Sequence, residues 1–268
     1  MRDGAIEAVL KRDRAMVLAA LITLAVLAWV HVLWLAAETA GVSPPMPDMP
    51  GMIMAPALQP WRAAELLLAF AMWSTMMAGM MLPSAAPMIL LYARVARQGE
   101  MQGKPFASAA WFAGGYLLAW SGFALVASVA QAALLQAPVT SPLPASTSLA
   151  FGGIVLIAAG LYQWTPLKDT CLAFCQSPLQ FIQRHGGFQR GAAPSLRLGL
   201  AHGLYCVGCC WALMALLLVV GVMNLLWIAG LAIWVLLEKI VPLGRVMPRT
   251  LGLVLILAGA IFLYRTPI

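Results

Sequence analysis

The sequence predicts an all-α polytopic membrane protein, a bundle of about seven transmembrane helices. Three observations indicate this class. Of the 268 residues, 63% are hydrophobic and 9% are charged, whereas about a quarter are charged in an ordinary soluble domain. The mean hydropathy is +0.90, and several apolar runs approach the roughly 20 residues that cross a bilayer. The basic residues gather in alternate connecting segments. A soluble globular fold is therefore excluded, and the lipid bilayer is the expected environment.

Windows of about nineteen residues define the candidate spans. In order along the chain, they cover residues 15–37, 64–92, 108–135, 148–164, 198–221, 225–237 and 250–264. The sixth span is short, and only three residues join it to the fifth. We therefore expect these two spans to form a tight helical hairpin, with Asn224 as its turn or helix cap.

The positions of Lys and Arg give the predicted orientation. Of these 16 residues, 14 lie in the N-terminal tail and in the second, fourth and sixth connections, and only Arg62 and Arg265 lie on the other side. Because cytoplasmic segments carry the excess of basic residues, we expect the N-terminus in the cytoplasm and the C-terminus outside. A basic tail (1–14) then precedes a single transmembrane domain (15–268), with an outer loop (38–63) and a cytoplasmic loop (165–197). The anionic cytoplasmic leaflet accounts for the net charge of +7, so no nucleic-acid partner is expected.

Sulfur-containing residues mark the candidate chemistry, because thiolate and thioether ligands select soft ions such as Cu(I). The chain has 16 Met and 5 Cys, and the cysteines form no even, regularly spaced set that would predict a disulfide framework. The first of four sulfur-rich places is the Pro-rich outer loop, where Met46, Met49 and Met52 recur every three residues. This loop is a candidate collector of Cu(I). Alternatively, it is a linker that uses Met as a flexible hydrophobic residue.

The second place is the methionine-rich second span. At 100° per residue its methionines form two stripes on roughly opposite faces of a helix: Met72, Met76 and Met80 on one, and Met77, Met81 and Met88 on the other. We expect only one stripe to line a central path. Pro83 and Pro87 should kink the helix. The alternative is that Met fills irregular gaps beside the kink.

The third and most specific place lies in the fifth span. It holds His202, Cys206, Cys209 and Cys210, with Met214 one turn later. The imidazole and the three thiols project from one side of a helix, so they can converge on a soft metal or a redox centre. A single buried Cys would be read as a small apolar residue. In the same span Gly199 and Gly203 would let a neighbour such as the second span pack closely.

The fourth place is the CxxxC pair Cys171 and Cys175, where the chain leaves the fourth span. Both sulfurs would share one helix face, and Lys168 could favour a thiolate there. Unpaired structural thiols are the alternative. Charges inside the predicted spans are few. We expect Glu65, at the start of the second span, and Glu238, beside Lys239 at the end of the sixth, to lie at the membrane interfaces.

The expected depths of these residues in the bilayer suggest that the four places are connected. At 1.5 Å per residue, the turns that carry Met76 and Cys206 lie at similar depths in a core of about 30 Å, and His31 lies near the outer boundary. A soft ion could therefore pass from the outer loop past His31 and Met72 to the second span and the cysteines of the fifth, and then to the CxxxC pair. A single chaperone site would use the same residues without transport.

Several motifs together resemble a bacterial family of predicted metal-binding integral membrane proteins of unknown function, for which copper handling is suggested. They are Met-Met-Ala-Gly-Met-Met-Leu-Pro at 76–83, Tyr-Gln-Trp-Thr-Pro-Leu-Lys at 162–168, Cys-Val-Gly-Cys-Cys-Trp at 206–211, and Glu238-Lys239. The resemblance covers most of residues 61–239 and implies a protein of the bacterial cytoplasmic (inner) membrane. It implies metal binding at Met76, Met77, Met80, Met81, Cys171, Cys175, Cys206, Cys209 and Cys210.

The favoured function is copper handling: delivery, chaperoning or transport of Cu(I), with a copper enzyme or a soluble copper carrier as partner and without turnover of an organic substrate. A mercury or other thiophilic-metal permease is an alternative, because Cys209 and Cys210 are vicinal in a membrane helix. A membrane thiol-disulfide oxidoreductase is another, although it would need a second exchangeable pair near the outer face. A purely structural subunit is the remaining alternative.

Overall fold

The computed structural model describes residues 2–41, 62–102, 108–136, 145–188, 190–222, 224–241 and 244–265, and within them the regular structure is entirely helical. The helices are α1 (Arg2–Gly41), α2 (Ala63–Met101), α3 (Ala109–Gln136), α4 (Ala145–Tyr162), α5 (Pro166–Gln176), α6 (Pro178–Arg184), α7 (Ala192–Ala215), α8 (Leu217–Val220), α9 (Leu225–Ile240) and α10 (Val246–Tyr264). The predicted all-α class is confirmed.

Five helical stretches are long and apolar enough to cross a membrane. They are Ala15–Glu38, Ala63–Glu100, Ala109–Gln136, Ala192–Val220 and Val246–Tyr264. A sixth candidate is the pair α4 and α5, which is bent by 63° between its two helices. The predicted sixth span corresponds to α9, whose 16 residues make it shorter than the others. The count of seven spans and the orientation of the ends therefore stay predictions.

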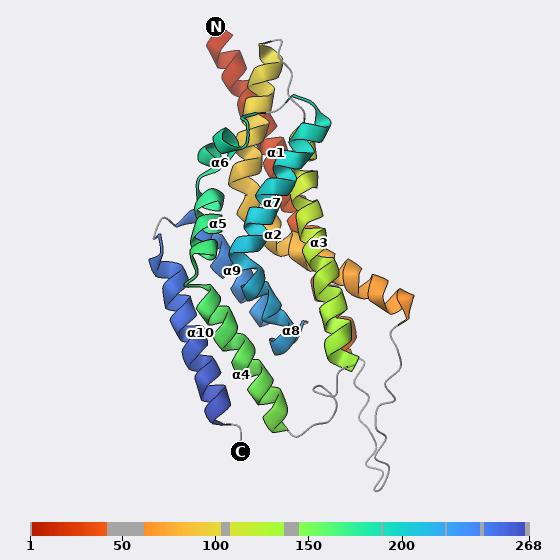
Figure 1. Ribbon diagram of the computed structural model, residues 1–268. Coiled ribbons are helices and arrows are strands. Elements are labelled where there is room, and N and C mark those ends of the chain that lie inside the picture. Colours follow the sequence, from red (N-terminus) through yellow and green to blue (C-terminus); the bar gives the residue numbers. More distant parts are fainter. Residues whose placement is uncertain are drawn as a thin grey trace.

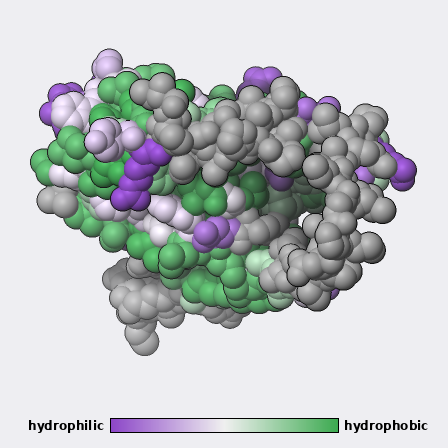
Figure 2. Space-filling model, turned by 90° about the horizontal axis from the view of Figure 1, so that it is seen from below, coloured by the Kyte–Doolittle hydropathy of each residue, from purple (hydrophilic) through white to green (hydrophobic). Residues whose placement is uncertain are grey.

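The helices pack side by side in one bundle. The most extensive contacts join α3 to α7, α4 to α10 and α1 to α2, and α5 packs against α7. Helix α1 begins at one end of the bundle and α10 ends at the opposite end (Figure 1). Many large apolar side chains face outward, for example Val126 at 66% exposure and Ile154 at 58%. Apolar residues also cover much of the described surface seen from below (Figure 2). So much exposed apolar surface indicates association with a membrane.

Glycines bring α3 and α7 into close contact. A Cβ at Gly199 would lie 2.0 Å from the carbonyl oxygen of Phe112, and a Cβ at Gly115 would lie 2.0 Å from that of Leu196. Close packing at Gly199 and Gly203 is confirmed, but the expected neighbour, the second span, is wrong. The partner is α3, because α3 carries the matching small residue at Gly115.

Helix α2 runs through Pro83 and Pro87 without ending, and its orange first part turns relative to its yellow last part (Figure 1). After α7 and the short α8, Gly221 adopts φ +108° and opens the turn to α9. Asn224 caps α9, since its side chain accepts a hydrogen bond from the Trp227 N–H at 3.4 Å. The predicted cap is confirmed. Helix α9 packs more against α2 than against α7, so the expected tight hairpin is replaced by a short turn between two separated helices.

The segment expected as a cytoplasmic loop contains two helices. Thr165 caps α5, because its hydroxyl accepts a hydrogen bond from the Lys168 N–H at 3.3 Å, and Pro166 occupies the first turn. Proline suits this position because its missing N–H would have no helical partner there. Helix α5 therefore starts directly after the bend and packs against α7, which brings the CxxxC pair into the bundle.

Candidate metal centre

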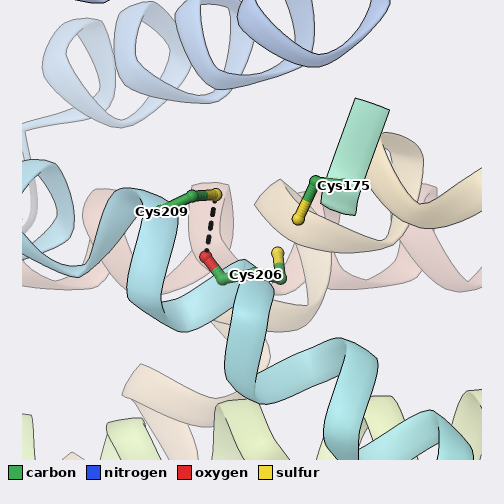
Figure 3. Close-up of side chains that lie close together, drawn as sticks. All are labelled: Cys175, Cys206 and Cys209. Carbon is green, nitrogen blue, oxygen red and sulfur yellow. Dashed lines mark hydrogen bonds between the residues drawn. The ribbon is translucent and has the colours of Figure 1, made fainter. Parts of the chain in front are cut away.

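Three cysteines from two helices form a compact thiol cluster. The Sγ atoms of Cys175 on α5 and of Cys206 and Cys209 on α7 lie within 4.8 Å of one another, and the sulfur of Cys175 points toward that of Cys206 (Figure 3). Cys206 and Cys209 are buried and Cys175 is half-buried. All five cysteines of the chain are free. We call Cys175, Cys206 and Cys209 the thiol cluster.

The spacing on α7 explains how two of the thiols meet. Residues three and four apart share a helix face, and the thiols of Cys209 and Cys210 both donate hydrogen bonds to the Cys206 carbonyl oxygen, at 3.1 and 3.0 Å. Cys210 is buried but is not a member of the group of three. The sequence analysis treated the cysteines of α5 as a separate place, whereas the structure joins Cys175 to the pair on α7.

Side chains from α3 and α9 also reach the Cys206 sulfur, and each of them in turn contacts α2. Lys239 of α9 donates a hydrogen bond from its Nζ to the Cys206 Sγ at 2.9 Å and another to the Ser84 Oγ of α2 at 2.8 Å. The Tyr116 hydroxyl of α3 lies 3.1 Å from the same sulfur and donates to the Met81 carbonyl of α2 at 3.1 Å. The ammonium of Lys239 favours a thiolate at Cys206, whereas the Tyr116 hydroxyl, whose proton is donated to Met81, can accept a hydrogen bond from the Cys206 thiol.

Sequence reasoning missed these partners of Cys206. It placed Glu238 at the membrane interface without a partner, whereas Glu238 is buried inside the bundle and only 1% exposed. The one sequence feature that could have drawn attention to Lys239 is its position next to Glu238 at the end of an apolar helix. No pattern in the sequence pointed to Tyr116, whose role depends on the contact between α3 and α7.

A buried ion pair fixes α5 against α9. Lys168 and Glu238 are 0% and 1% exposed, and the Lys168 Nζ lies 2.8 Å from a Glu238 carboxylate oxygen. Gln176 adds a hydrogen bond from its Nε2 to the Glu238 carbonyl at 2.7 Å. The sequence analysis assigned the charge of Lys168 to the thiols of the CxxxC pair, but its hydrogen-bond partner is Glu238. The two attachments lie on either side of Cys175 along α5 and so hold this thiol in place.

Cys171 packs against the backbone of α7. A Cβ at Gly208 would lie 2.8 Å from the Cys171 Sγ, so the glycine within the Cys-Val-Gly-Cys-Cys motif provides the space for α5. The Tyr162 hydroxyl donates a hydrogen bond to the Gly208 carbonyl and ties the end of α4 to the same turn.

Both methionine stripes of α2 are buried. The side chains of Met76, Met77, Met80, Met81 and Met88 are all at most 2% exposed. Both stripes are buried because α2 contacts α1, α3 and α9 and is enclosed on several sides, and which of them lines a central path stays a prediction. Met72 is half-buried at the edge of the core, and Met214 of α7 is fully buried. The Tyr116 hydroxyl contacts both the Met81 carbonyl and the Cys206 sulfur, so this turn of α2 lies near Cys206.

The predicted histidines occupy different surroundings. His31 is half-buried on α1 and stacks on Trp34, with ring centroids 5.8 Å apart; it is not part of the thiol cluster. His202 is 3% exposed and lies among the rings of Phe112, Tyr116 and Phe181. Its Nδ1 has no hydrogen-bond partner among the described residues. Met46, Met49 and Met52 lie outside the described residues.

The donor set of the thiol cluster fits a soft metal ion. Metal–sulfur bonds of about 2.3 Å allow two sulfurs of one site to be up to about 4.6 Å apart, close to the 4.8 Å limit of the cluster. A shift of a few tenths of an ångström would bring all three sulfurs into bonding range. Thiolates, with buried thioethers nearby, select Cu(I) over harder ions.

The comparison with protein families agrees with this chemistry. The model of the PpoB2 family, described as a copper chaperone, matches residues 70–262. The matched range holds all five cysteines and extends from α2 into α10. Comparisons with curated proteins and with solved structures gave no match. Because the family model covers well over half of the chain, the protein belongs to the PpoB2 copper chaperone family.

Proposed function

We propose that the protein binds Cu(I) at the thiol cluster within a bacterial cytoplasmic membrane and passes it to a copper enzyme or a soluble copper carrier. The observation that carries this proposal is the convergence of three free thiols from α5 and α7 to within 4.8 Å. Membership of a copper chaperone family supports copper as the ion. Copper is here the cargo, so the site must release it as well as bind it.

The arrangement suits binding and release by ligand exchange. Each thiol loses a proton when it binds the ion, and the ammonium of Lys239 beside Cys206 offsets part of the resulting negative charge. Two of the sulfurs come from α7 and one from α5, so a small displacement of α5 changes a three-sulfur site into a two-sulfur site. A sulfur of the acceptor can then take the vacated position. This ligand exchange transfers the ion without a change in its oxidation state.

The methionines of α2 are the proposed approach to the cluster. Thioethers are neutral ligands that bind Cu(I) without deprotonation, and those of Met76, Met77, Met80 and Met81 are buried in the same core. The predicted outer residues Met46, Met49, Met52, His31 and Met72 belong to this proposal as the earlier part of an inward route. Delivery without transport would need only the cluster and its nearest methionines.

A thiol-disulfide oxidoreductase is the second candidate, and one observation favours it. The ammonium of Lys239 lies 2.9 Å from the Cys206 sulfur, an environment typical of reactive thiolates, and Cys175 is near enough to be its resolving partner. A mercury permease has less support, because it would bind the ion with the vicinal Cys209 and Cys210 together. The Cys210 thiol instead donates a hydrogen bond to the Cys206 carbonyl and lies outside the thiol cluster.

The test is the metal content of protein purified in detergent under reducing, anaerobic conditions, measured by mass spectrometry. Wild-type protein is compared with a Cys175→Ser, Cys206→Ser, Cys209→Ser triple variant and with Cys210→Ser. Near-stoichiometric copper that is lost in the triple variant supports the proposal, and retention in Cys210→Ser would assign the site to the cluster rather than to the vicinal pair. Absence of soft metal from correctly folded wild type would overturn it. A Cys175–Cys206 disulfide that forms and is reduced with a partner would support the oxidoreductase.

A further inference from the structure

Two histidines, His202 of α7 and His185 at the end of α6, pack against one aromatic ring. The ring of Phe181 in α6 is 5.0 Å from that of His202 and 4.3 Å from that of His185, measured between centroids. His202 lies one turn before Cys206 on α7, and its ring is 5.9 Å from that of Tyr116, whose hydroxyl reaches the Cys206 sulfur. A chain of contacts therefore links the thiol cluster to His202 through Tyr116, and His202 to His185 through Phe181.

Both imidazoles have a nitrogen available for a metal. The Nδ1 of His202 is buried and has no hydrogen-bond partner in the described part of the chain, which is costly for a polar atom unless it has a further use. The Nδ1 of His185 lies 2.9 Å from the Phe181 carbonyl. A carbonyl oxygen can only accept, so Nδ1 carries the proton and Nε2 keeps its lone pair. A backbone carbonyl that fixes the tautomer in this way is a common feature of metal-binding histidines.

His185 is placed where a soluble acceptor can reach it. It is half-buried at the end of α6 and is followed by Gly186 and Gly187, both with positive φ. Helix α6 lies toward the end of the bundle at which α1 begins (Figure 1). The rings of Phe174 and Tyr205 lie 6.1 and 5.6 Å from that of His185, so aromatic carbon surrounds the imidazole on its inner side.

We propose that His202 and His185 form a relay that carries Cu(I) from the thiol cluster to a soluble acceptor, with Phe181 closing the way between them. The relay rests on the proposed function. Each step exchanges one ligand: a copper–sulfur bond to the cluster is replaced by a copper–nitrogen bond to His202, and that bond is replaced by one to His185. Imidazole is a suitable ligand for copper, and the ion keeps its oxidation state. The Phe181 ring packs against both imidazoles, so passage from one to the other requires this ring to rotate.

The test measures the rate of copper release. Cu(I)-loaded protein in detergent is mixed with the water-soluble chelator bathocuproine disulfonate, and the coloured complex is followed by stopped-flow absorbance. His185→Phe and His202→Phe keep an aromatic ring but remove the ligand, and each should slow release at least about tenfold, the size of effect seen when the surroundings of a metal ligand are lost. Phe181→Leu should accelerate release. Gln183→Ala, at an exposed position of α6, is the matched control and should release copper at the wild-type rate.

The amount of bound copper is measured first, so that equally loaded proteins are compared. If wild type holds Cu(I) at the cluster but both histidine variants release it at the wild-type rate, the relay is wrong and the proposed function stands. If the wild-type protein binds no Cu(I), the relay and the proposed function are both wrong. His185→Gln serves as a second variant if His185→Phe does not fold, and an unchanged release rate in that variant would equally overturn the relay.

Discussion

At the scale of single residues, Lys239 determines the charge at the cluster. Its Nζ donates to both the Cys206 Sγ and the Ser84 Oγ, so the ammonium is held by α2 and α7 together. A Cu(I) ion bound by several thiolates leaves the site negatively charged. The ammonium stabilises that charge, and in the absence of copper it also occupies a hydrogen-bonding position on the sulfur. The first effect raises the affinity for Cu(I) and the second lowers it, so a substitution of Lys239 shows which effect is larger.

We expect Lys239→Met to weaken Cu(I) binding about tenfold or more. Two charges about 4 Å apart in protein surroundings interact by about 4 kcal/mol, and about 1.4 kcal/mol corresponds to a factor of ten in affinity. Competition titration with a chromogenic Cu(I) chelator measures the dissociation constant. Lys239→Arg retains the charge and should bind nearly as wild type does. Tighter binding by Lys239→Met would instead show that the ammonium competes with the ion.

Gly208 controls how closely α5 approaches α7. A Cβ at this position would lie 2.8 Å from the Cys171 Sγ but at an ordinary 3.6 Å from the Cys171 Cβ. We expect Gly208→Ala to displace α5, to lower the stability by about 1–3 kcal/mol and to weaken Cu(I) binding through Cys175. Thermal unfolding in detergent and chelator competition measure the two effects.

The double variant Gly208→Ala, Cys171→Ala provides the control for this prediction. It removes the sulfur that would clash and should restore both stability and binding. If the double variant binds copper no better than Gly208→Ala alone, Cys171 acts as a ligand rather than as a packing neighbour, which is the role that the family resemblance implies.

At the scale of elements, α5 is held in the bundle by polar contacts in addition to apolar packing. Its Lys168 and Gln176 both bind Glu238 of α9, one through the carboxylate and one through the carbonyl, and Trp234 donates to the same carboxylate at 3.4 Å. Charged groups inside a membrane protein are costly and usually serve a function. Here the cost is offset in part by the ion pair and by the Trp234 hydrogen bond, and the result is a defined position for Cys175.

We expect Lys168→Met to destabilise the protein by about 3–5 kcal/mol, because removal of one partner leaves a buried charge without compensation. The double variant Lys168→Met, Glu238→Leu removes both charges and should recover most of that stability. Unfolding in detergent, followed by circular dichroism, gives these values. If the double variant loses as much stability as Lys168→Met alone, the unpaired charge of Glu238 is not the cause of the destabilisation.

The double variant also separates stability from positioning. If the ion pair places Cys175, the number of sulfurs bound to Cu(I), as measured by X-ray absorption, should fall from three to two even where stability is restored. Three sulfurs in the double variant would show that apolar packing alone sets the position of α5.

Features that depend on residues close together in the chain could be predicted from the sequence, whereas the packing between helices could not. Helix periodicity assigned the thiols of Cys206 and Cys209 to one face of one helix, and composition located Asn224 as a cap, because both depend on residues near one another in the chain. Periodicity does not give the rotation of one helix against the next or the 63° bend between α4 and α5. The joining of Cys175 to the cluster, the pairing of Lys168 with Glu238 and the partner of Gly199 all depend on that packing.

At the scale of the whole molecule, the positions of the two ends lead us to expect an odd number of membrane passes. Helix α1 begins at one end of the bundle and α10 ends at the other (Figure 1), as we would expect if the two ends lie on opposite sides of the membrane. Five long spans and the bent pair of α4 and α5 give an even number. We therefore expect α9 to contribute a seventh pass. Its 16 residues extend about 24 Å, less than a core of about 30 Å, and local thinning of the bilayer can accommodate that mismatch.

This reasoning makes a prediction about the ends of the chain. Green fluorescent protein fused at the N-terminus should fluoresce, because it folds in the cytoplasm, and alkaline phosphatase fused at the C-terminus should be active, because it needs an oxidising exterior. The exchanged fusions should both be silent. Removal of the segment from 225 to 265, which holds α9 and α10, takes away two passes and should leave the new C-terminus outside. A fluorescent C-terminal fusion of the full chain would mean that either α9 or the bent pair does not cross, and the depth shared by the methionines and the thiol cluster would then need another explanation.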